Sequence, residues 1–137
     1  MKRVKMNQHQ SRRVAMQAVY LANQEPTYTA SEVEAKTVAT LNLKELSAYS
    51  KNIIEGVIEK REEIKANLAS CLKENWRIDR ISQILLAILE VALYEIKYSM
   101  DIEPRAAINE ALNLCDEFAD PKNKPFVNGI LANFIKK

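Results

Sequence analysis

The chain has 137 residues, of which 47% are hydrophobic and 28% are charged, and its formal net charge is +2. This length is typical of one domain, and the apolar fraction is large enough for a buried core. Only two glycines and four prolines are present, which argues against a β-sheet protein and favours helices joined by short loops. No apolar run near the start resembles a signal peptide, so we expect a cytoplasmic protein without membrane contact.

The charges are unevenly distributed along the chain. Residues 1–24 carry five basic groups and no acid, residues 25–121 carry eleven basic and eighteen acidic groups, and residues 122–137 carry four lysines and no acid. If the two ends fold onto the same side, they form one positive surface, which is typical of a polyanion site. The alternative is that terminal lysines only aid solubility, and we favour it for Lys136 and Lys137.

Apolar residues at helical spacing predict the first helix over residues 9–23, after a flexible basic arm over residues 1–8. A second, short helix follows. Ser31 and Glu34 fit a capping box at its start, and we expect it to end near Thr40.

A longer periodic run begins at Leu43 or Lys44, and we expect it to break once near Lys60 into two helices. Gly56 lies inside this run, where glycine costs about 1 kcal/mol relative to alanine. This cost indicates a close crossing of two helices at Gly56. In the connection that follows, Trp76 is expected to pack onto the core.

Residues 84–94 form the stretch around which the other helices are expected to pack. Ten of its eleven residues are apolar or aromatic, and its only charge is Glu90. A helix that is apolar on nearly all sides is buried, and eleven residues are far fewer than the roughly 20 that span a bilayer. Asp79 or Ser82 is the expected cap, and the helix is predicted to end near Ser99.

Two further helices complete the chain. One begins at Pro104, because proline fits the first helical position, and it ends at Asp120. The last begins at Lys124 or Pro125 and runs to about Ile135. The sequence therefore predicts an all-α fold of about seven helices around a central apolar helix.

The chain lacks the residue patterns of catalytic and metal sites. It has one histidine, His9, and its cysteines, Cys71 and Cys115, have no metal-binding spacing. Buried reduced thiols are favoured over a disulfide, and the two glycines are too far apart for a phosphate-binding loop. We therefore expect a binding module, with no enzymatic activity, no cofactor and no metal.

Motifs in the C-terminal third resemble the NusB family of bacterial transcription antitermination factors. They are Ala107-Ile108-Asn109-Glu110-Ala111, Phe118, and Phe126-Val127-Asn128-Gly129-Ile130-Leu131. Similar motifs occur in the first helix, at Gly56-Val57, and over residues 75–80 and 91–95. The resemblance thus covers nearly the whole chain in order.

The resemblance implies a fold of two packed helical sub-bundles. It also implies binding of single-stranded boxA RNA from ribosomal RNA leader transcripts, together with NusE, a small-subunit ribosomal protein, and action on the RNA polymerase elongation complex. Such RNA recognition requires cations for the phosphates and flat ring faces for unstacked bases. Stacking one base on an aromatic ring is worth about 1–3 kcal/mol.

We expect the RNA site to combine cations from both ends of the chain with aromatic rings and amides: Lys2, Arg3, Lys5, Arg12, Arg13, Gln17, Phe118, Lys122, Lys124, Phe126 and Asn128. Spacing alone favours core packing for Phe118 and Phe126, and only the resemblance implies their partial exposure. Asn128 has two interpretations, a buried amide that bridges helices and a base contact.

The partner-binding positions that the resemblance implies are Tyr20, Leu85, Leu86 and Glu90. Many family members carry a charged residue where this chain has Leu85 and Leu86, and an arginine where it has Glu90. We expect one or both leucines to form an exposed apolar contact patch. A carboxylate at position 90 is expected to repel phosphate, and Lys122, at a position where an acid is common, partly offsets this.

Two other functions remain open from the sequence. Leu85, Leu86 and Glu90 motivate a protein–protein adaptor or a homodimer with weak RNA binding. An RNA-guiding domain of a ribosomal RNA methyltransferase is ranked last, because the chain ends at Lys137 with no catalytic domain after the last helix.

Overall fold

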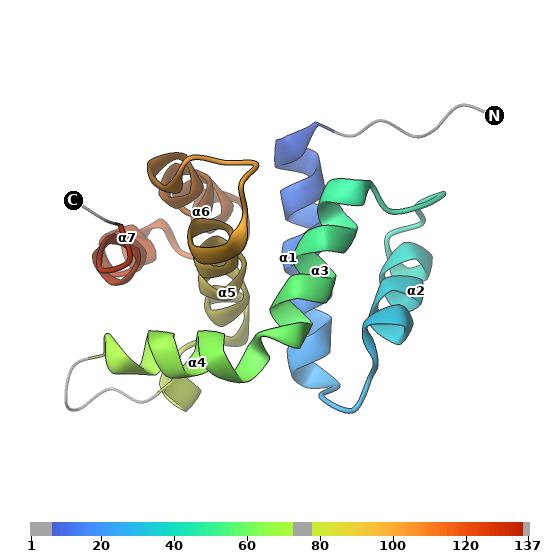
Figure 1. Cartoon of the computed structure of the whole chain (residues 1–137), viewed down its shortest axis with the longest axis horizontal. Helices are drawn as coiled ribbons and strands as arrows, with labels where there is room; N and C mark the ends of the chain where they lie inside the picture. The colour runs from blue at the N-terminus through green and yellow to red at the C-terminus, as the bar shows by residue number, and fades with distance from the viewer. Residues whose placement is uncertain (1–6, 73–77, 136–137) are drawn as a thin grey trace.

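The computed structural model describes residues 7–72 and 78–135, apart from the side chain of Asp79. In these ranges it has seven α-helices, two short 3-10 helices and no strand (Figure 1). The α-helices are α1 (Gln8–Gln24), α2 (Ala30–Thr40), α3 (Ala48–Glu59), α4 (Arg61–Ser70), α5 (Gln83–Tyr98), α6 (Pro104–Phe118) and α7 (Lys124–Ala132). The 3-10 helices are η1 (Ile78–Arg80) and η2 (Pro121–Asn123). The predicted all-α fold is confirmed.

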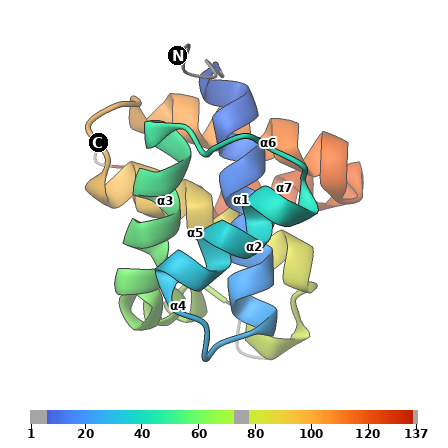
Figure 2. The ribbon, with the colours of Figure 1, turned by 90° about the vertical axis from the view of Figure 1, so that its right-hand side faces the viewer.

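Helix α5 is the one on which most others pack. It contacts α1, α3, α4, α6 and α7, and residues 85–95 are all buried. Helices α1, α2 and α3 form one sub-bundle and α4 to α7 the other, with α1 and α5 in contact between them (Figures 1 and 2). No helix in the described ranges is both long and apolar enough to cross a membrane.

Helix α3 crosses α5 at Gly56, as predicted. A Cβ atom at this position would overlap the ring of Tyr94. The Tyr94 hydroxyl donates a hydrogen bond of 2.8 Å to Asn52 Oδ1, one turn earlier on α3. The glycine is therefore required by the short distance between the two helices.

A capping box fixes the start of α1. The Asn7 side chain accepts a hydrogen bond from the backbone N–H of Gln10, and the Gln10 side chain accepts one from the backbone N–H of Asn7. This satisfies donors that a helix start leaves unpaired. The helix therefore begins at Gln8, one residue earlier than predicted, and residues 1–6 of the expected arm lie outside the described residues.

The capping box of α2 differs from the predicted one. Thr29 and Glu32 form it, with Glu32 N 3.1 Å from the Thr29 hydroxyl and Thr29 N 2.9 Å from the Glu32 carboxylate. The predicted pair, Ser31 and Glu34, is wrong because both residues lie inside the helix.

Helix α3 begins at Ala48, capped by Ser47, and not at Leu43 or Lys44. The preceding loop includes Asn42 at a φ of 55°, a left-handed conformation that asparagine tolerates and a helix cannot contain. The predicted break at Lys60 is confirmed, because this residue ends α3 and precedes α4.

The later boundaries follow the prediction closely. Ser82 caps α5 through a hydrogen bond of 3.3 Å to its hydroxyl from Leu85 N, and α6 begins at Pro104. Helix α7 begins at Lys124 but ends at Ala132, three residues before the predicted end. Trp76 and the side chain of Asp79 lie outside the described residues, so their predicted roles stay predictions.

Candidate nucleic-acid interface

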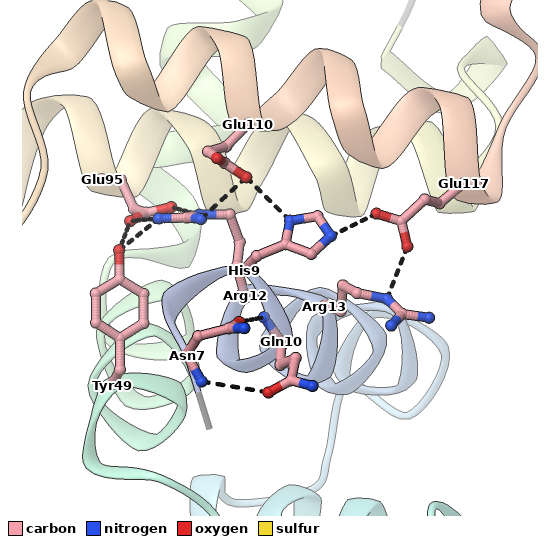
Figure 3. A network of polar contacts seen from close by, with 9 residues as sticks. All are labelled: Asn7, His9, Gln10, Arg12, Arg13, Tyr49, Glu95, Glu110 and Glu117. Carbon is pink, nitrogen blue, oxygen red and sulfur yellow. Dashed lines mark hydrogen bonds and ion pairs between the residues drawn. The ribbon is translucent and has the colours of Figure 1, made fainter. Parts of the chain in front are cut away.

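The first half of α1 faces α5 and α6 through a network of charged side chains (Figure 3). Its cationic side comes from α1, its acids come from α5 and α6, and one tyrosine comes from α3. The members are His9, Arg12, Arg13, Tyr49, Glu95, Glu110 and Glu117.

Arg12 lies at the buried end of this network. Its guanidinium donates to both Glu95 carboxylate oxygens, at 2.7 Å from Nε and 3.1 Å from Nη2. Nη2 also donates to the Tyr49 hydroxyl at 2.7 Å, and Nη1 lies 3.3 Å from a Glu110 oxygen. Only 2% of the Arg12 side chain is exposed. The expected phosphate contact from Arg12 is therefore wrong, because its donors are used inside the protein.

The pKa shifts of Arg12 and Tyr49 keep both groups protonated near neutral pH. Burial lowers the pKa of Arg12, but the hydrogen bond and charge of Glu95, together with the charges of Tyr49 and Glu110, raise it, and the net shift is upward. Burial, followed by the hydrogen bond to Glu95, raises the pKa of Tyr49. Arg12 thus stays charged and Tyr49 stays neutral, which lets the Tyr49 hydroxyl donate to Glu95.

Arg13 lies at the exposed end of the network. Its Nε is 2.8 Å from Glu117 Oε2, and 45% of its side chain is exposed. Its guanidinium carbon lies 5.6 Å from the centroid of the Phe118 ring, a distance at which a cation is attracted to a ring face. Phe118 is half-buried, which confirms the partial exposure implied by the resemblance. The structure thus brings together one expected cation and one expected ring from distant parts of the chain.

Four other expected RNA contacts follow Phe118 along the chain: Lys122, Lys124, Phe126 and Asn128. Lys122 on η2 is exposed, and Lys124 Nζ pairs with Asp116 Oδ2 at 3.0 Å. Phe126 is half-buried on α7, and Asn128 is exposed. The interpretation of Asn128 as a buried amide between helices is therefore wrong. Three further expected cations lie outside the described residues: Lys2, Arg3 and Lys5.

A groove of about 360 Å³ lies between α1 and α2. It is next to the α1–α6 junction, the place where Arg13 of α1 meets Phe118 of α6. Its walls are mostly apolar, and among the described residues that line it only Lys36 is charged. Three expected site residues share the groove: Gln17, Tyr20 and Phe118. The exposed face of the α1–α6 junction and the groove therefore meet at Phe118.

Comparison with known proteins identifies the family. The family model named NusB family matches residues 9–136. The chain belongs to the NusB family. Transcription antitermination proteins NusB from Lacticaseibacillus casei (strain BL23) and Ligilactobacillus salivarius (strain UCC118) are 37% and 32% identical over 130 residues. These matches cover 95% of this chain in both cases, and 95% and 98% of the two relatives.

Solved structures show the same NusB fold. NusB from T. maritima has a TM-score of 0.80 at 21% identity, with 96% of this chain and 92% of that chain covered. A chain in the crystal structure of a plectonemic RNA supercoil has a TM-score of 0.79 at 25% identity, with 94% of each chain covered. Membership of the NusB family makes this protein a transcription antitermination factor and not an enzyme.

Three of the four partner-binding positions implied by the NusB resemblance are buried. Leu85 and Leu86 are each only 5% exposed, so the expected apolar contact patch at these residues is wrong. Their neighbour Ile84 is half-buried and lines the groove, as Tyr20 does. Ile84 and Leu85 are consecutive residues of α5, and one residue rotates the side chain by about 100°. This rotation places Ile84 in the groove wall and Leu85 in the core.

Glu90 is also buried, with no exposed surface. One of its oxygens accepts a hydrogen bond of 2.5 Å from Asn23 Nδ2, and burial raises its pKa. The expected repulsion of phosphate by a surface carboxylate at this position is therefore wrong. With Leu85, Leu86 and Glu90 all buried, the residues that motivated an adaptor or a homodimer offer no such surface.

The two cysteines form no disulfide, as predicted. Cys71 and Cys115 are both free, the first half-buried and the second buried. Within the described ranges, no three histidine, cysteine or acidic side chains are grouped so as to hold a metal ion.

Sequence reasoning assigned no role to two residues at the exposed end of the network, His9 and Glu117. His9 Nδ1 lies 3.1 Å from Glu110 Oε1, and His9 Nε2 lies 2.7 Å from Glu117 Oε1. Glu110 and Glu117 are seven residues apart, which places them on one helix face. That spacing was a usable signal, but no pattern in the sequence indicates that this face meets α1.

Proposed function

We propose that this NusB-family protein binds single-stranded boxA-type RNA of ribosomal RNA leader transcripts together with NusE. In this proposal the assembly acts on the RNA polymerase elongation complex in the cytoplasm. The observation that carries the RNA part is the Arg13 guanidinium lying over the Phe118 ring at the exposed α1–α6 junction. The pair supplies a phosphate-binding cation and a ring on which a base can stack.

The proposed RNA path continues from Phe118 along the chain. Lys122 on η2 is exposed four residues later, and Asn128 is exposed on α7. Lys124 is paired with Asp116 on the surface, where ion pairs are weak and a phosphate can compete. On charge alone the proposal adds Lys2, Arg3 and Lys5 as phosphate contacts. The fold shared with a chain crystallised in an RNA supercoil supports RNA as the ligand.

A titration of boxA-like RNA followed by fluorescence anisotropy tests this proposal. The affinity should fall with salt, with a slope of about −0.7 in log K against log salt for each phosphate contact. Phe118→Ala should weaken binding by about 1–3 kcal/mol through the lost stack, and Arg13→Ala should flatten the slope. Arg105→Ala is the matched control, because Arg105 is exposed at the other end of α6, about 20 Å away. Absence of binding at low salt, with NusE present, overturns the proposal.

We place NusE on the groove between α1 and α2. The groove is mostly apolar, contains Tyr20, and borders the proposed RNA surface at Phe118, so one partner can contact both. Thr40 is exposed and lines the groove, whereas its neighbour Ala39 is exposed and does not. Thr40→Trp should therefore block NusE binding in a pull-down while RNA affinity stays unchanged, and Ala39→Trp should have no effect. Equal NusE binding by both variants places the partner elsewhere.

A further inference from the structure

Glu117 contacts two basic side chains of α1 with the two oxygens of one carboxylate (Figure 3). Oε1 lies 2.7 Å from His9 Nε2, and Oε2 lies 2.8 Å from Arg13 Nε. The side chains of His9, Arg13 and Glu117 are 39%, 45% and 30% exposed. This cluster is therefore open to solvent, in contrast to the buried pair of Arg12 and Glu95.

A phosphodiester group presents the same kind of acceptor as this carboxylate, with two oxygens of one anion side by side. His9 and Arg13 are four residues apart, so they lie on one face of α1 in successive turns. We propose that His9 and Arg13 form a binding site for one phosphate of the RNA backbone, which Glu117 occupies as an internal competitor in the free protein. The inference rests on the proposed function for the identity of the anion as an RNA phosphate.

The two donors remain held in place when Glu117 leaves. Glu110 Oε1 lies 3.1 Å from His9 Nδ1, and this contact keeps Nε2 directed at the position that Glu117 occupies. Arg13 lies over the Phe118 ring, and its two terminal nitrogens lie on the side away from Glu117 (Figure 3). An RNA phosphate can therefore replace the Glu117 carboxylate while His9 and Arg13 keep their positions.

The exchange has an energetic consequence for RNA affinity. In the presence of Glu117, RNA must break the two contacts of this carboxylate with His9 and Arg13 in order to form two of its own, so the net gain at this site is small. Without the carboxylate, His9 Nε2 and Arg13 Nε are available to the phosphate. Glu117 therefore lowers RNA affinity, and its removal raises it.

Glu117→Gln tests this in the RNA titration. Exposed ion pairs contribute little to stability, so the fold should be unchanged, as circular dichroism can verify. We expect RNA affinity to rise about threefold to tenfold at low salt, with a steeper salt slope from the freed cations. Glu62→Gln removes the same charge from an exposed site on α4, which lies at the other end of the molecule from the start of α1 (Figure 1), and should leave the affinity unchanged.

The double variant Glu117→Gln with Arg13→Ala separates this site from a general charge effect. If the phosphate replaces Glu117 on His9 and Arg13, the gain from Glu117→Gln disappears when Arg13 is absent. A gain that persists without Arg13, or an affinity of Glu117→Gln equal to that of wild type, overturns the inference.

A second measurement does not depend on RNA. The chain has one histidine, so its imidazole signals in an NMR spectrum all belong to His9. Inorganic phosphate should shift these signals saturably in Glu117→Gln, more weakly in wild type, and least in the double variant. Absence of a phosphate-dependent shift in Glu117→Gln overturns the inference. Wild-type protein that binds no RNA overturns the proposed function, while the phosphate titration still decides on the site.

Discussion

Arg12 and Arg13 are adjacent in the sequence, but Arg12 forms a buried ion pair and Arg13 forms an exposed one. One residue of an α-helix rotates the side chain by about 100°, so the first meets Glu95 of α5 and the second meets the end of α6. Arg12 is 2% exposed and Arg13 is 45% exposed. The sequence shows two equal cations, and only the packing of α5 against α1 distinguishes them.

This difference predicts opposite effects for the two alanine variants. Arg12→Ala leaves the Glu95 carboxylate buried without its charge partner, which should lower the free energy of unfolding by about 3–5 kcal/mol. Arg13→Ala removes only an exposed ion pair, so the loss should be below about 1 kcal/mol. Urea denaturation followed by circular dichroism measures both. Similar losses in the two variants would contradict the burial of Arg12.

At the scale of helices, residues that determine close packing could be predicted. Gly56 indicated a crossing of two helices before any coordinates were known, because a glycine inside a helix needs a reason. Residues 84–94 indicated a buried helix because only one charge interrupts them. At Gly56 the close crossing excludes a side chain, and along residues 84–94 burial excludes most charged residues. Such exclusions can be recognised in the sequence.

The start of α2 could not be predicted in the same way. Thr29 with Glu32 and Ser31 with Glu34 both fit a capping box, and local sequence does not choose between them. In the structure Glu34 interacts with Glu55 and Lys51 of α3. Packing of α2 on α3 therefore decides which acid caps the helix.

The two glycines provide a matched pair of tests for helix packing. Gly56→Ala adds a methyl group that overlaps the Tyr94 ring, so the fold should lose about 1–3 kcal/mol. Gly129→Ala adds the same group to α7, where no atom of the described residues outside the adjacent helix backbone lies within 4 Å. This variant should gain about 0.5–1 kcal/mol from the better helix propensity. Thermal denaturation should therefore show shifts of opposite sign, and a gain for Gly56→Ala would contradict the close crossing.

The contact between α2 and α3 predicts a pH dependence of stability. Burial, and then the nearby Glu55 carboxyl, raise the pKa of Glu34 from 4.5 to about 7, while Lys51 opposes the shift. The folded protein therefore binds more protons than the unfolded chain between these two values. Where the folded state binds more protons, stability falls as the pH rises. The contribution is thus fully present below about pH 4.5 and lost as the pH rises through about 7.

Glu34→Gln should remove this dependence, because glutamine does not titrate. Urea midpoints at pH 5 and pH 8 measure it, and the difference between them should be smaller in Glu34→Gln than in wild type. Glu45→Gln, at an exposed residue of the loop before α3, should retain the wild-type difference. An unchanged difference in Glu34→Gln would show that Glu34 titrates as an ordinary carboxyl.

At the scale of the whole molecule, the charge distribution predicted part of the candidate site. Arg13 from the basic start of the chain does meet Phe118 near its basic end. The sum of charges along the sequence did not predict that Glu110 and Glu117 would face α1 and neutralise much of its charge. The net charge of a sequence counts its basic and acidic residues, whereas the surface potential of the folded protein depends on which of these residues form ion pairs. The acidic middle of the chain therefore supplies the partners of its basic start.

The contact of α1 with α5 of the other sub-bundle also affects how the protein is made. This helix leaves the ribosome before α5 and α6, and Arg12 finds Glu95 only after 83 further residues have been translated. A nascent chain that ends at α4 can already pack α1 against α3, but His9, Arg12 and Arg13 still lack their carboxylate partners from α5 and α6. The newly synthesised amino-terminal half is thus a more basic particle than the finished protein, and it loses that character only in the last stage of synthesis.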